Sequence, residues 1–238
     1  MTYSILARDP ATGALGAAVA SRFFAVGALC IHVEGGVAAL ATQAFINPMY
    51  AVHAIARLRA GEAPQAVLDA LVAPDPGRAQ RQLHILGAGG GAGGGIAQHT
   101  GGGCVSWAGH LRGADVSAAG NMLAGPAVVD AMLSGFAAAG GSLAERLLAA
   151  LQAGEDAGGD KRGRQSAGLK VASADPYPDL DIRADDHPDP LAELRRLHRV
   201  SLERYAVFRR HLAGTADPWG TLDRDVIEAA IARDGLPL

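Results

Sequence analysis

Short apolar segments separated by tight turns make up the beginning of the chain. Residues 2–8 and 14–21 have strand character, and the turn over residues 9–13 carries proline at its second position and glycine at its end. This pattern predicts a β-hairpin. Residues 29–33 and 36–41 predict a second hairpin. Because these segments carry few charges, we expect both faces of the strands to be covered.

Helical periodicity begins at Asn47 and Pro48, an N-cap residue followed by proline in the first helical position. A helix is predicted from Pro48 to Gly61, and a second over residues 63–71. Strands are predicted over residues 81–86, 96–100, 104–108 and 116–122. The glycine-rich residues 87–95 predict a flexible hairpin turn rather than a phosphate-binding loop, because no strand–GK[ST]–helix context surrounds them.

The second half of the chain continues with helices and strands. Helices are predicted over residues 127–138, 142–153, 190–212 and 223–233, and strands over residues 166–174 and 180–183. Ser142 and Glu145 form a capping box at the start of their helix. The buried face of the long helix is predicted from its apolar spacing, with Leu191, Leu194, Leu197, Val200 and Leu202 as candidates.

This order of elements indicates the fold class. Runs of strands alternate with pairs of helices, which fits stacked β-sheets with helices outside better than a parallel sheet with single crossovers. No proline-rich, serine-rich or highly charged segment divides the 238 residues. We therefore expect a single α+β domain over residues 1–238, with the helical segment over about 213–238 as a peripheral extension.

Composition narrows the class of protein. Hydrophobic residues make up 49% of the chain, which is typical of a packed globular protein. The net charge of −3 gives no basic surface for nucleic acid. No apolar run approaches the roughly 18 residues of a membrane-spanning helix. The first residues do not resemble a signal peptide, and two cysteines cannot form a disulfide framework. We expect a soluble, cytoplasmic protein.

One stretch concentrates charge beside a predicted strand. Residues 158–171 place Asp160, Arg162 and Arg164 among glycines, directly before an apolar run. Glycine permits the tight turns that would bring the guanidinium groups together. Arginine binds carboxylates and phosphates through two parallel hydrogen bonds. The pattern favours a polar site at the end of a buried strand; the alternative is a solvated turn whose charges only maintain solubility.

A second charged segment follows this stretch. Asp185, Asp186 and His187 supply oxygen and imidazole donors for a divalent metal. The alternative is structural, with Asp189 or His187 capping the next helix or pairing with a nearby arginine. Ser166 is a possible nucleophile, for which His187 is the available base.

The two cysteines differ in their surroundings. Cys104 follows three glycines and has His99 and His110 nearby in sequence, so it is a second candidate nucleophile. The alternative is an inert cysteine in an apolar strand. Cys30 lies within an apolar segment, which predicts a place in the core.

Several motifs together resemble one bacterial family. They are Met1-Thr2-Tyr3-Ser4-Ile5, Ala18-Val19-Ala20-Ser21-Arg22-Phe23, Ala41-Thr42-Gln43-Ala44, Asp75-Pro76-Gly77-Arg78, Trp107-Ala108-Gly109-His110, Gly120-Asn121, Gly159-Asp160-Lys161-Arg162-Gly163-Arg164-Gln165-Ser166 and Asp185-Asp186-His187-Pro188. On these motifs the chain is identified as a member of the family catalogued as domain of unknown function number 1028. This family is Ntn-hydrolase-like, similar in fold to proteasome β-subunits and N-terminal nucleophile amidases. The resemblance implies a four-layer αββα sandwich, and it implies no established reaction.

The resemblance also directs attention to the start of the chain. Ntn hydrolases use a terminal Thr, Ser or Cys whose own α-amine is the general base. Thr2 fits this role after removal of Met1, and Ala20-Ser21-Arg22 resembles the end of the first hairpin in a proteasome β-subunit. The chain departs from those subunits at Ala20, where they carry Asp, and roughly at His32, where they carry Lys. The alternative is that Thr2 only begins a strand.

We therefore expect hydrolysis of an amide-type C–N bond in a small anionic metabolite, by a homo-oligomer that needs no cofactor or metal. The expected catalytic residues are Thr2, Asn121, Asp160 and His187. The expected substrate-binding residues are Arg22, Gln43, Asn47, Arg162, Arg164 and Gln165. The arginines would bind the acid group, and the amides would orient the carbonyl or contribute to an oxyanion site.

Alternatives remain for both the site and the class of protein. Gln43 and Asn121 could equally be buried structural amides. Water activated near Asp160 or His187 is the alternative to Thr2. A non-catalytic protein that keeps the fold and binds a small anionic ligand or a partner is the alternative to a hydrolase.

Overall fold

Two antiparallel β-sheets form the centre of the protein in the computed structural model, which describes residues 2–89 and 94–236. The six-stranded sheet has the order β10-β9-β2-β1-β8-β7, with β1 (Thr2–Arg8), β2 (Leu15–Ser21), β7 (Gly109–Arg112), β8 (Val116–Asn121), β9 (Ser166–Ala172) and β10 (Leu180–Ala184). The four-stranded sheet has the order β3-β4-β5-β6, with β3 (Ile31–Glu34), β4 (Ala38–Ala44), β5 (Arg81–Ala88) and β6 (Gly94–Thr100). The α+β class expected from the sequence is confirmed. Of the turn predicted over residues 87–95, residues 90–93 lie outside the described part of the chain.

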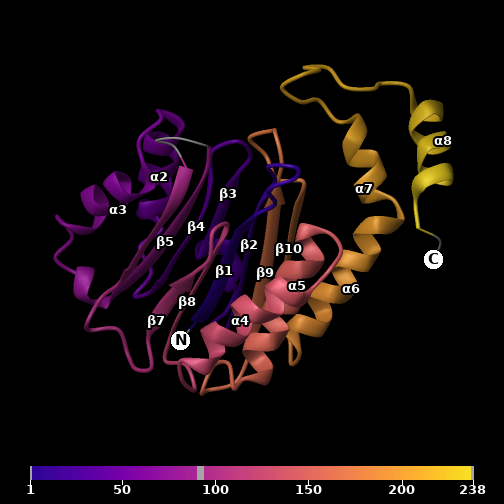
Figure 1. Ribbon diagram of the computed structural model, residues 1–238. Helices are drawn as coiled ribbons and strands as arrows, with labels where there is room; N and C mark the ends of the chain where they lie inside the picture. Colours follow the sequence, from indigo (N-terminus) through magenta and orange to yellow (C-terminus); the bar gives the residue numbers. More distant parts are fainter. Residues whose placement is uncertain (1, 90–93, 237–238) are drawn as a thin grey trace.

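Helices pack against both sheets (Figure 1). α2 (Met49–Arg59) and α3 (Pro64–Val72) cover the four-stranded sheet, and α4 (Ala127–Ala138), α5 (Leu143–Asp156) and α6 (Pro190–Glu203) cover the six-stranded sheet. The remaining helical segments are α1 (Val26–Leu29), η1 (Arg78–Gln80), α7 (Tyr205–Phe208), η3 (Arg209–His211) and α8 (Arg224–Asp234). Within residues 2–89 and 94–236, none of the helices has the length and hydropathy that a membrane span requires.

Strand β1 shows how alternation along a strand builds two cores. Tyr3 and Ile5 belong to the core beneath α4 and α5. Leu6 belongs instead to the core between the two sheets, together with Leu15 of β2 and Ile31 of β3. Successive side chains of a strand point to opposite faces. Both faces of this mildly polar hairpin are therefore covered, as its sequence predicts.

Small residues allow close approach between α1 and β9. A Cβ added to Gly168 would lie 2.8 Å from the Cα of Gly27, and one added to Gly27 would lie 2.9 Å from the Cα of Gly168. These distances are shorter than real Cβ contacts. Glycine is therefore required on both sides of this contact.

The strand predicted over residues 104–108 is wrong. These residues form an irregular loop, and β7 begins after it. The two residues that follow β8 donate backbone hydrogen bonds to the carbonyls of Val105 and Trp107. The loop is thus held at the end of β8 without a regular ladder, which the apolar pattern alone does not reveal.

The helix predicted over residues 190–212 is interrupted. α6 ends at Glu203, and Arg204 has φ −136° and ψ −46°, outside the helical region. α7 then begins, and its Val207 joins a small apolar cluster with α8. Packing against α8 accompanies the break in helical periodicity. Figure 1 shows α7 and α8 beyond the end of α6, at the margin of the molecule.

The buried face of α6 also differs from the prediction. Leu191 and Leu194 are buried as expected, whereas Val200 is 44% exposed. The buried positions that follow are His198 and Ser201. Their spacing continues the same stripe of the helix, and Val200 lies beside it.

Candidate functional site

Four strands of the larger sheet bring polar side chains together at one end. Thr2, the first residue of β1, pairs with Ser21 at the end of β2 and with Asn121 at the end of β8. Ser21 also pairs with Ser166, the first residue of β9. Paired residues point to the same face of a sheet. We call Asn121, Thr2, Ser21 and Ser166 the strand-end row; with neighbouring strands about 4.8 Å apart, it spans about 14 Å.

Thr2 occupies a central place in this row. Its Oγ1 lies 3.1 Å from Oγ of Ser21, and the residue is 4% exposed. The same face of β1 carries Ser4 and Leu6, which lie between the two sheets. Thr2 is therefore at the end of the inter-sheet space, where the strands stop.

Asp160 connects the charged loop to the row. Its buried carboxylate accepts the backbone N–H of Arg22 at 2.9 Å and that of Arg162 at 2.8 Å. The Arg162 guanidinium lies 3.2 Å from the same carboxylate. Because Arg22 directly follows Ser21, this contact fixes the loop beside the strand-end row.

A cavity of about 240 Å³ lies next to this loop. We call it the arginine cavity; its lining residues are Arg22, Arg164, Gln165, Asp186, His187 and Pro188. The backbone N–H of Gln165 donates to the carbonyl of Ser21 at 3.0 Å, so the cavity adjoins the strand-end row. The structure thus brings Arg22, Arg164, Gln165 and His187, all expected at the site, to one cavity.

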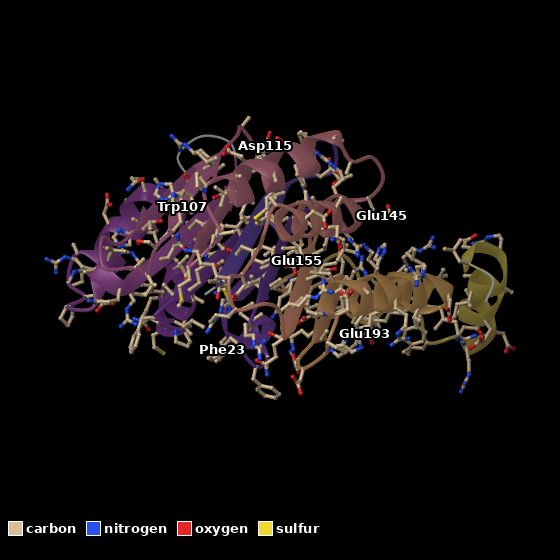
Figure 2. The ribbon with its side chains drawn as sticks, turned by 90° about the horizontal axis from the view of Figure 1, so that it is seen from below. Phe23, Trp107, Asp115, Glu145, Glu155 and Glu193 are labelled. Atoms are coloured by element: carbon tan, nitrogen blue, oxygen red, sulfur yellow. The ribbon has the colours of Figure 1, made fainter. Side chains whose placement is uncertain are left out.

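The two arginines of the cavity differ in their partners. Nη1 of Arg22 donates to the Arg162 carbonyl at 3.0 Å, and no carboxylate of the described residues lies within ion-pair distance of Arg22. Arg164 lies 3.6 Å from Glu155 and 3.2 Å from Asp189. In Figure 2, Glu155 lies near the centre of the view. The guanidinium of Arg22 is therefore the less neutralised of the two.

The structure separates the arginines of the charged loop. Arg162 contacts Asp160 and does not line the arginine cavity, whereas Arg164 does. Gly163, between them, has φ +92°, a left-handed conformation that glycine adopts without strain. The expected grip on an acid group by both Arg162 and Arg164 therefore lacks a common cavity.

A second cavity of about 230 Å³ lies on the other side of Thr2. We call it the Asn121 cavity; its lining residues are Ala44, Phe45, Gln80, Gly103, Cys104, Val105, Asn121 and Met122. Ala44 has φ +66° and Met122 has φ +56°, both in the left-handed region. Such strain costs about 1–3 kcal/mol per residue and clusters at binding and active sites. The sequence patterns did not predict the Asn121 cavity.

Gln43 lies in a buried network between the sheets rather than on either cavity. Its Oε1 accepts from Ser4 Oγ at 2.6 Å, and its Nε2 donates to Gln82 Oε1 at 2.7 Å. The same Gln82 oxygen accepts from Asn121 Nδ2 at 3.1 Å. Both ends of the Gln43 amide are thus engaged. Gln82 was not identified from the sequence. An amide side chain within a mainly apolar strand, opposite Gln43, is the pattern that could have identified it.

His84 continues this network and was also missed. Its Nε2 lies 2.9 Å from Ser4 Oγ, and its Nδ1 lies 2.7 Å from Ser117 Oγ. Because Ser4 donates to Gln43, it accepts from His84, which places the proton on Nε2. Burial lowers the pKa of His84 to about 3, so the ring is neutral. Ser4 and His84 are both fully buried and cannot meet a substrate.

Comparison with known proteins identifies the family. The family model described as "Family of unknown function (DUF1028)" matches residues 2–194. The chain belongs to this family. Protein SPO2555 from Silicibacter pomeroyi, a DUF1028 protein with a crystal structure, is 33% identical; the alignment covers 94% of this chain and 96% of that one, with a TM-score of 0.85.

Other comparisons add little to the DUF1028 assignment. Anbu (ancestral beta-subunit) from Yersinia bercovieri is 14% identical over 84% of this chain and 94% of that one, with a TM-score of 0.40. Among curated proteins, no sequence matches this chain.

In this DUF1028 chain, Asn47 lies at the start of α2. Its Oδ1 accepts the backbone N–H of Met49 at 3.1 Å, and its own N–H donates to Thr42 Oγ1 at 3.3 Å. Asn47 thus stabilises the beginning of the helix, as its sequence context predicts. It lines neither the arginine cavity nor the Asn121 cavity.

Cys104 has no histidine partner among the described residues. Its Sγ donates to the carbonyl of Arg81 at 3.3 Å, whereas His99 contacts the Arg78 carbonyl and His110 contacts Thr100. Burial raises the pKa of the Cys104 thiol, which keeps it protonated. A thiol is a far weaker nucleophile than a thiolate.

His187 and Ser166 do not pair. Ser166 Oγ donates to the carbonyl of Phe23 and accepts from the backbone of Val26. His187 Nδ1 accepts the N–H of Asp189, whose carboxylate caps α6. Capping of this helix by Asp189, which the structural alternative predicts, is therefore confirmed. In the part of the chain that the structure describes, no three His, Cys, Asp or Glu side chains gather as metal ligands.

A larger cavity, of about 580 Å³, lies between α5 and α6. Arg195, one of its lining residues, donates to Gln152 at 2.7 Å, so these polar groups satisfy each other. None of the residues expected at the site lines this cavity. A ligand site needs convergent polar groups as well as volume, and these converge at the strand-end row.

Proposed function

We propose that this DUF1028 protein hydrolyses an amide-type C–N bond in a small anionic metabolite, with Thr2 as the nucleophile. The observation that carries the proposal is the place of Thr2 in the strand-end row, at the start of a central strand and with its Oγ1 3.1 Å from the hydroxyl of Ser21. Thr2 lines neither cavity itself; it lies between Asn121, which lines one, and Ser21, whose carbonyl binds Gln165 of the other. Two sheets with helices packed on them support assignment to the four-layer αββα sandwich of Ntn hydrolases.

The proposed reaction requires removal of Met1. The nitrogen of Thr2 is then an α-amine with a pKa of about 7.7–8.0, suited to general base catalysis near neutral pH. Oγ1 of Thr2 bonds to the carbonyl carbon while the amine takes its proton. The proton passes to the leaving nitrogen as the C–N bond breaks. Water then adds to the resulting ester, releases the carboxylic acid and restores the hydroxyl.

The residues around Thr2 have separate roles in this proposal. Asn121 donates from its amide to the oxyanion that develops on the carbonyl oxygen. Arg22 binds the anionic group of the substrate in the arginine cavity, with His187 on the same wall. Asp160 acts through the backbone of Arg22 and holds it in place. Asp160 is thus a positioning residue, and His187 contacts the anion.

Two measurements test this proposal. Intact-mass analysis of untagged protein is expected to show that Met1 is absent from active material. Release of amino acids from a panel of N-acyl amino acids is expected for the natural chain and for Thr2→Ser, and is abolished in Thr2→Ala with an unchanged unfolding temperature. Turnover by Thr2→Ala, or by protein that retains Met1, excludes the mechanism.

Non-catalytic anion binding is the second candidate function. It is favoured by the arginine cavity, which is complete without Thr2 and holds the guanidinium of Arg22 without a carboxylate partner among the described residues. In this case, protein that retains Met1 binds small dicarboxylates in calorimetry as tightly as processed protein, and no member of the panel is hydrolysed.

A further inference from the structure

We infer that the site binds an N-acylated acidic amino acid of glutamate length. Its apolar acyl chain occupies the Asn121 cavity, and its side-chain carboxylate occupies the arginine cavity. The inference rests on the proposed function for the position of the scissile bond, because it places that bond at Thr2. It goes further in naming the class of substrate and the cavity for each half.

The two cavities differ in chemistry. The arginine cavity is lined by Arg22, Arg164, Gln165, Asp186 and His187. Because Arg164 is paired with Glu155 and Asp189, the guanidinium of Arg22 is the cation that the cavity offers to a ligand. The Asp186 carboxylate accepts from the amide of Gln165 at 3.2 Å. The Asn121 cavity is lined largely by apolar side chains, including those of Phe45 and Val105. A ligand that fills both therefore has an anionic end and an apolar end.

The volume of the Asn121 cavity limits the acyl group. It is about 230 Å³. With about 30 Å³ for each water molecule in the liquid, this is room for roughly seven or eight heavy atoms. Hexanoyl and benzoyl groups have this size. An acetyl group would leave much of the cavity unfilled.

The strand spacing fixes the length of the other half. Thr2 is two strands away from Ser166, which follows Gln165 of the arginine cavity. This separation is about 10 Å. A γ-carboxylate in an extended glutamate lies about 7 Å from the acyl carbon by standard bond lengths, and a hydrogen bond to a guanidinium adds about 3 Å. The side chain of glutamate therefore reaches the cavity.

The wall of the Asn121 cavity is prepared for a ligand. Ala44 and Met122 hold left-handed backbone conformations, and the amide of Asn121 is anchored by Gln82. An amide nitrogen has two hydrogens, and Gln82 takes one of them. The other is available to the acyl carbonyl. A positioned donor lowers the cost of binding.

Cys104 gives a readout that does not depend on turnover. It lines the Asn121 cavity and is partly exposed, whereas Cys30 is fully buried and is the internal control. We expect N-hexanoyl-L-glutamate to slow the alkylation of Cys104 by N-ethylmaleimide in the full chain by about tenfold at saturation. N-acetyl-L-glutamate and N-hexanoyl-L-glutamine, measured at the same concentration, should protect Cys104 much less. The first lacks the long acyl chain, and the second lacks the side-chain carboxylate.

Turnover provides the second measurement. A group that fills an apolar pocket changes kcat/KM by about tenfold or more, so N-hexanoyl-L-glutamate should exceed N-acetyl-L-glutamate by at least that factor. Phe45→Ala removes an exposed apolar wall of the Asn121 cavity and should reduce this preference. Phe208→Ala, at another exposed phenylalanine that lines neither cavity, is the control and should retain the preference.

The outcomes separate this inference from the proposed function. Protection of Cys104 by N-hexanoyl-L-glutamate without hydrolysis upholds the ligand class and overturns the proposed reaction. Hydrolysis of both acyl compounds at equal rates, with no protection of Cys104, overturns the ligand class and upholds the reaction. Equal protection by the glutamine compound overturns the assignment of the arginine cavity to a carboxylate.

Discussion

The carboxylate of Asp160 accepts the backbone N–H of Arg22 at 2.9 Å, across 138 residues of chain. The same carboxylate accepts the backbone N–H of Arg162 and contacts its guanidinium. One buried side chain therefore fixes both the charged loop and the residue that carries the least neutralised guanidinium of the arginine cavity.

Asp160→Asn should destabilise the protein. A hydrogen bond to a charged group contributes about 1.5–3 kcal/mol, and the amide cannot reproduce the acceptor geometry of the carboxylate. We expect a decrease of about 2–3 kcal/mol in the free energy of unfolding, measured by urea titration. Asp156→Asn changes an exposed carboxylate on α5 and should alter stability by less than about 0.5 kcal/mol. Equal effects in the two variants would contradict the positioning role of Asp160.

Arg22→Lys should affect ligand binding, whereas Arg162→Lys should affect stability. Lysine cannot make the planar two-bond contact with a carboxylate. Arg22→Lys should therefore weaken the binding of N-hexanoyl-L-glutamate by about tenfold, or 1.4 kcal/mol, with little change in stability. Arg162→Lys should mainly lower stability, because Arg162 contacts Asp160. Calorimetry and urea unfolding of both variants check this, with Arg59→Lys, at the end of α2, as the control.

Gly168→Ala should be among the more damaging single-methyl changes. Its Cβ would lie 2.8 Å from the Cα of Gly27, so α1 and β9 would have to move apart. Overpacking of this kind costs about 1–3 kcal/mol. At Gly102 a Cβ meets no atom within 4 Å, so Gly102→Ala is a matched control with little expected effect. Thermal unfolding of the two variants compares them directly.

His84 should make stability depend on pH. Its pKa is lowered to about 3 in the folded state by burial, whereas an unfolded histidine titrates near 6.5. Between these values the unfolded chain binds one more proton, so stability falls as the pH falls, by about 1.4 kcal/mol per unit. From pH 6.5 to pH 4.5 the loss is about 2–3 kcal/mol. In His84→Gln this contribution disappears, so its unfolding free energy should change less over the same range.

Many of the local elements and part of the site could be predicted from the sequence. The hairpin of β1 and β2, the capping box at Ser142 and the start of α2 follow from turn chemistry and periodicity, which act over a few residues. The loop around Trp107 and the break at Arg204 depend on packing against segments distant in sequence. Periodicity contains no information on such contacts, so both predictions were wrong.

The site shows the same division. Arg22, Arg164, Gln165 and His187 stand in polar motifs and lie together at the arginine cavity. Gln82 stands in a mainly apolar strand and was missed, although it binds Asn121. The separation of Arg162 from Arg164 depends on the reversal of the backbone at Gly163. The sequence shows the position of this glycine, but the direction of each guanidinium is known only from the folded loop.

The central position of β1 has a consequence for synthesis of the chain. The hairpin of β1 and β2 leaves the ribosome before β8 and β9, the strands that cover its two open edges. At about 5–20 residues per second, β9 emerges roughly seven to thirty seconds after β2. Unpaired strand edges are templates for aggregation. The edges of β1 and β2, which are buried in the finished protein, thus remain unpaired in the nascent chain until β8 and β9 have been synthesised.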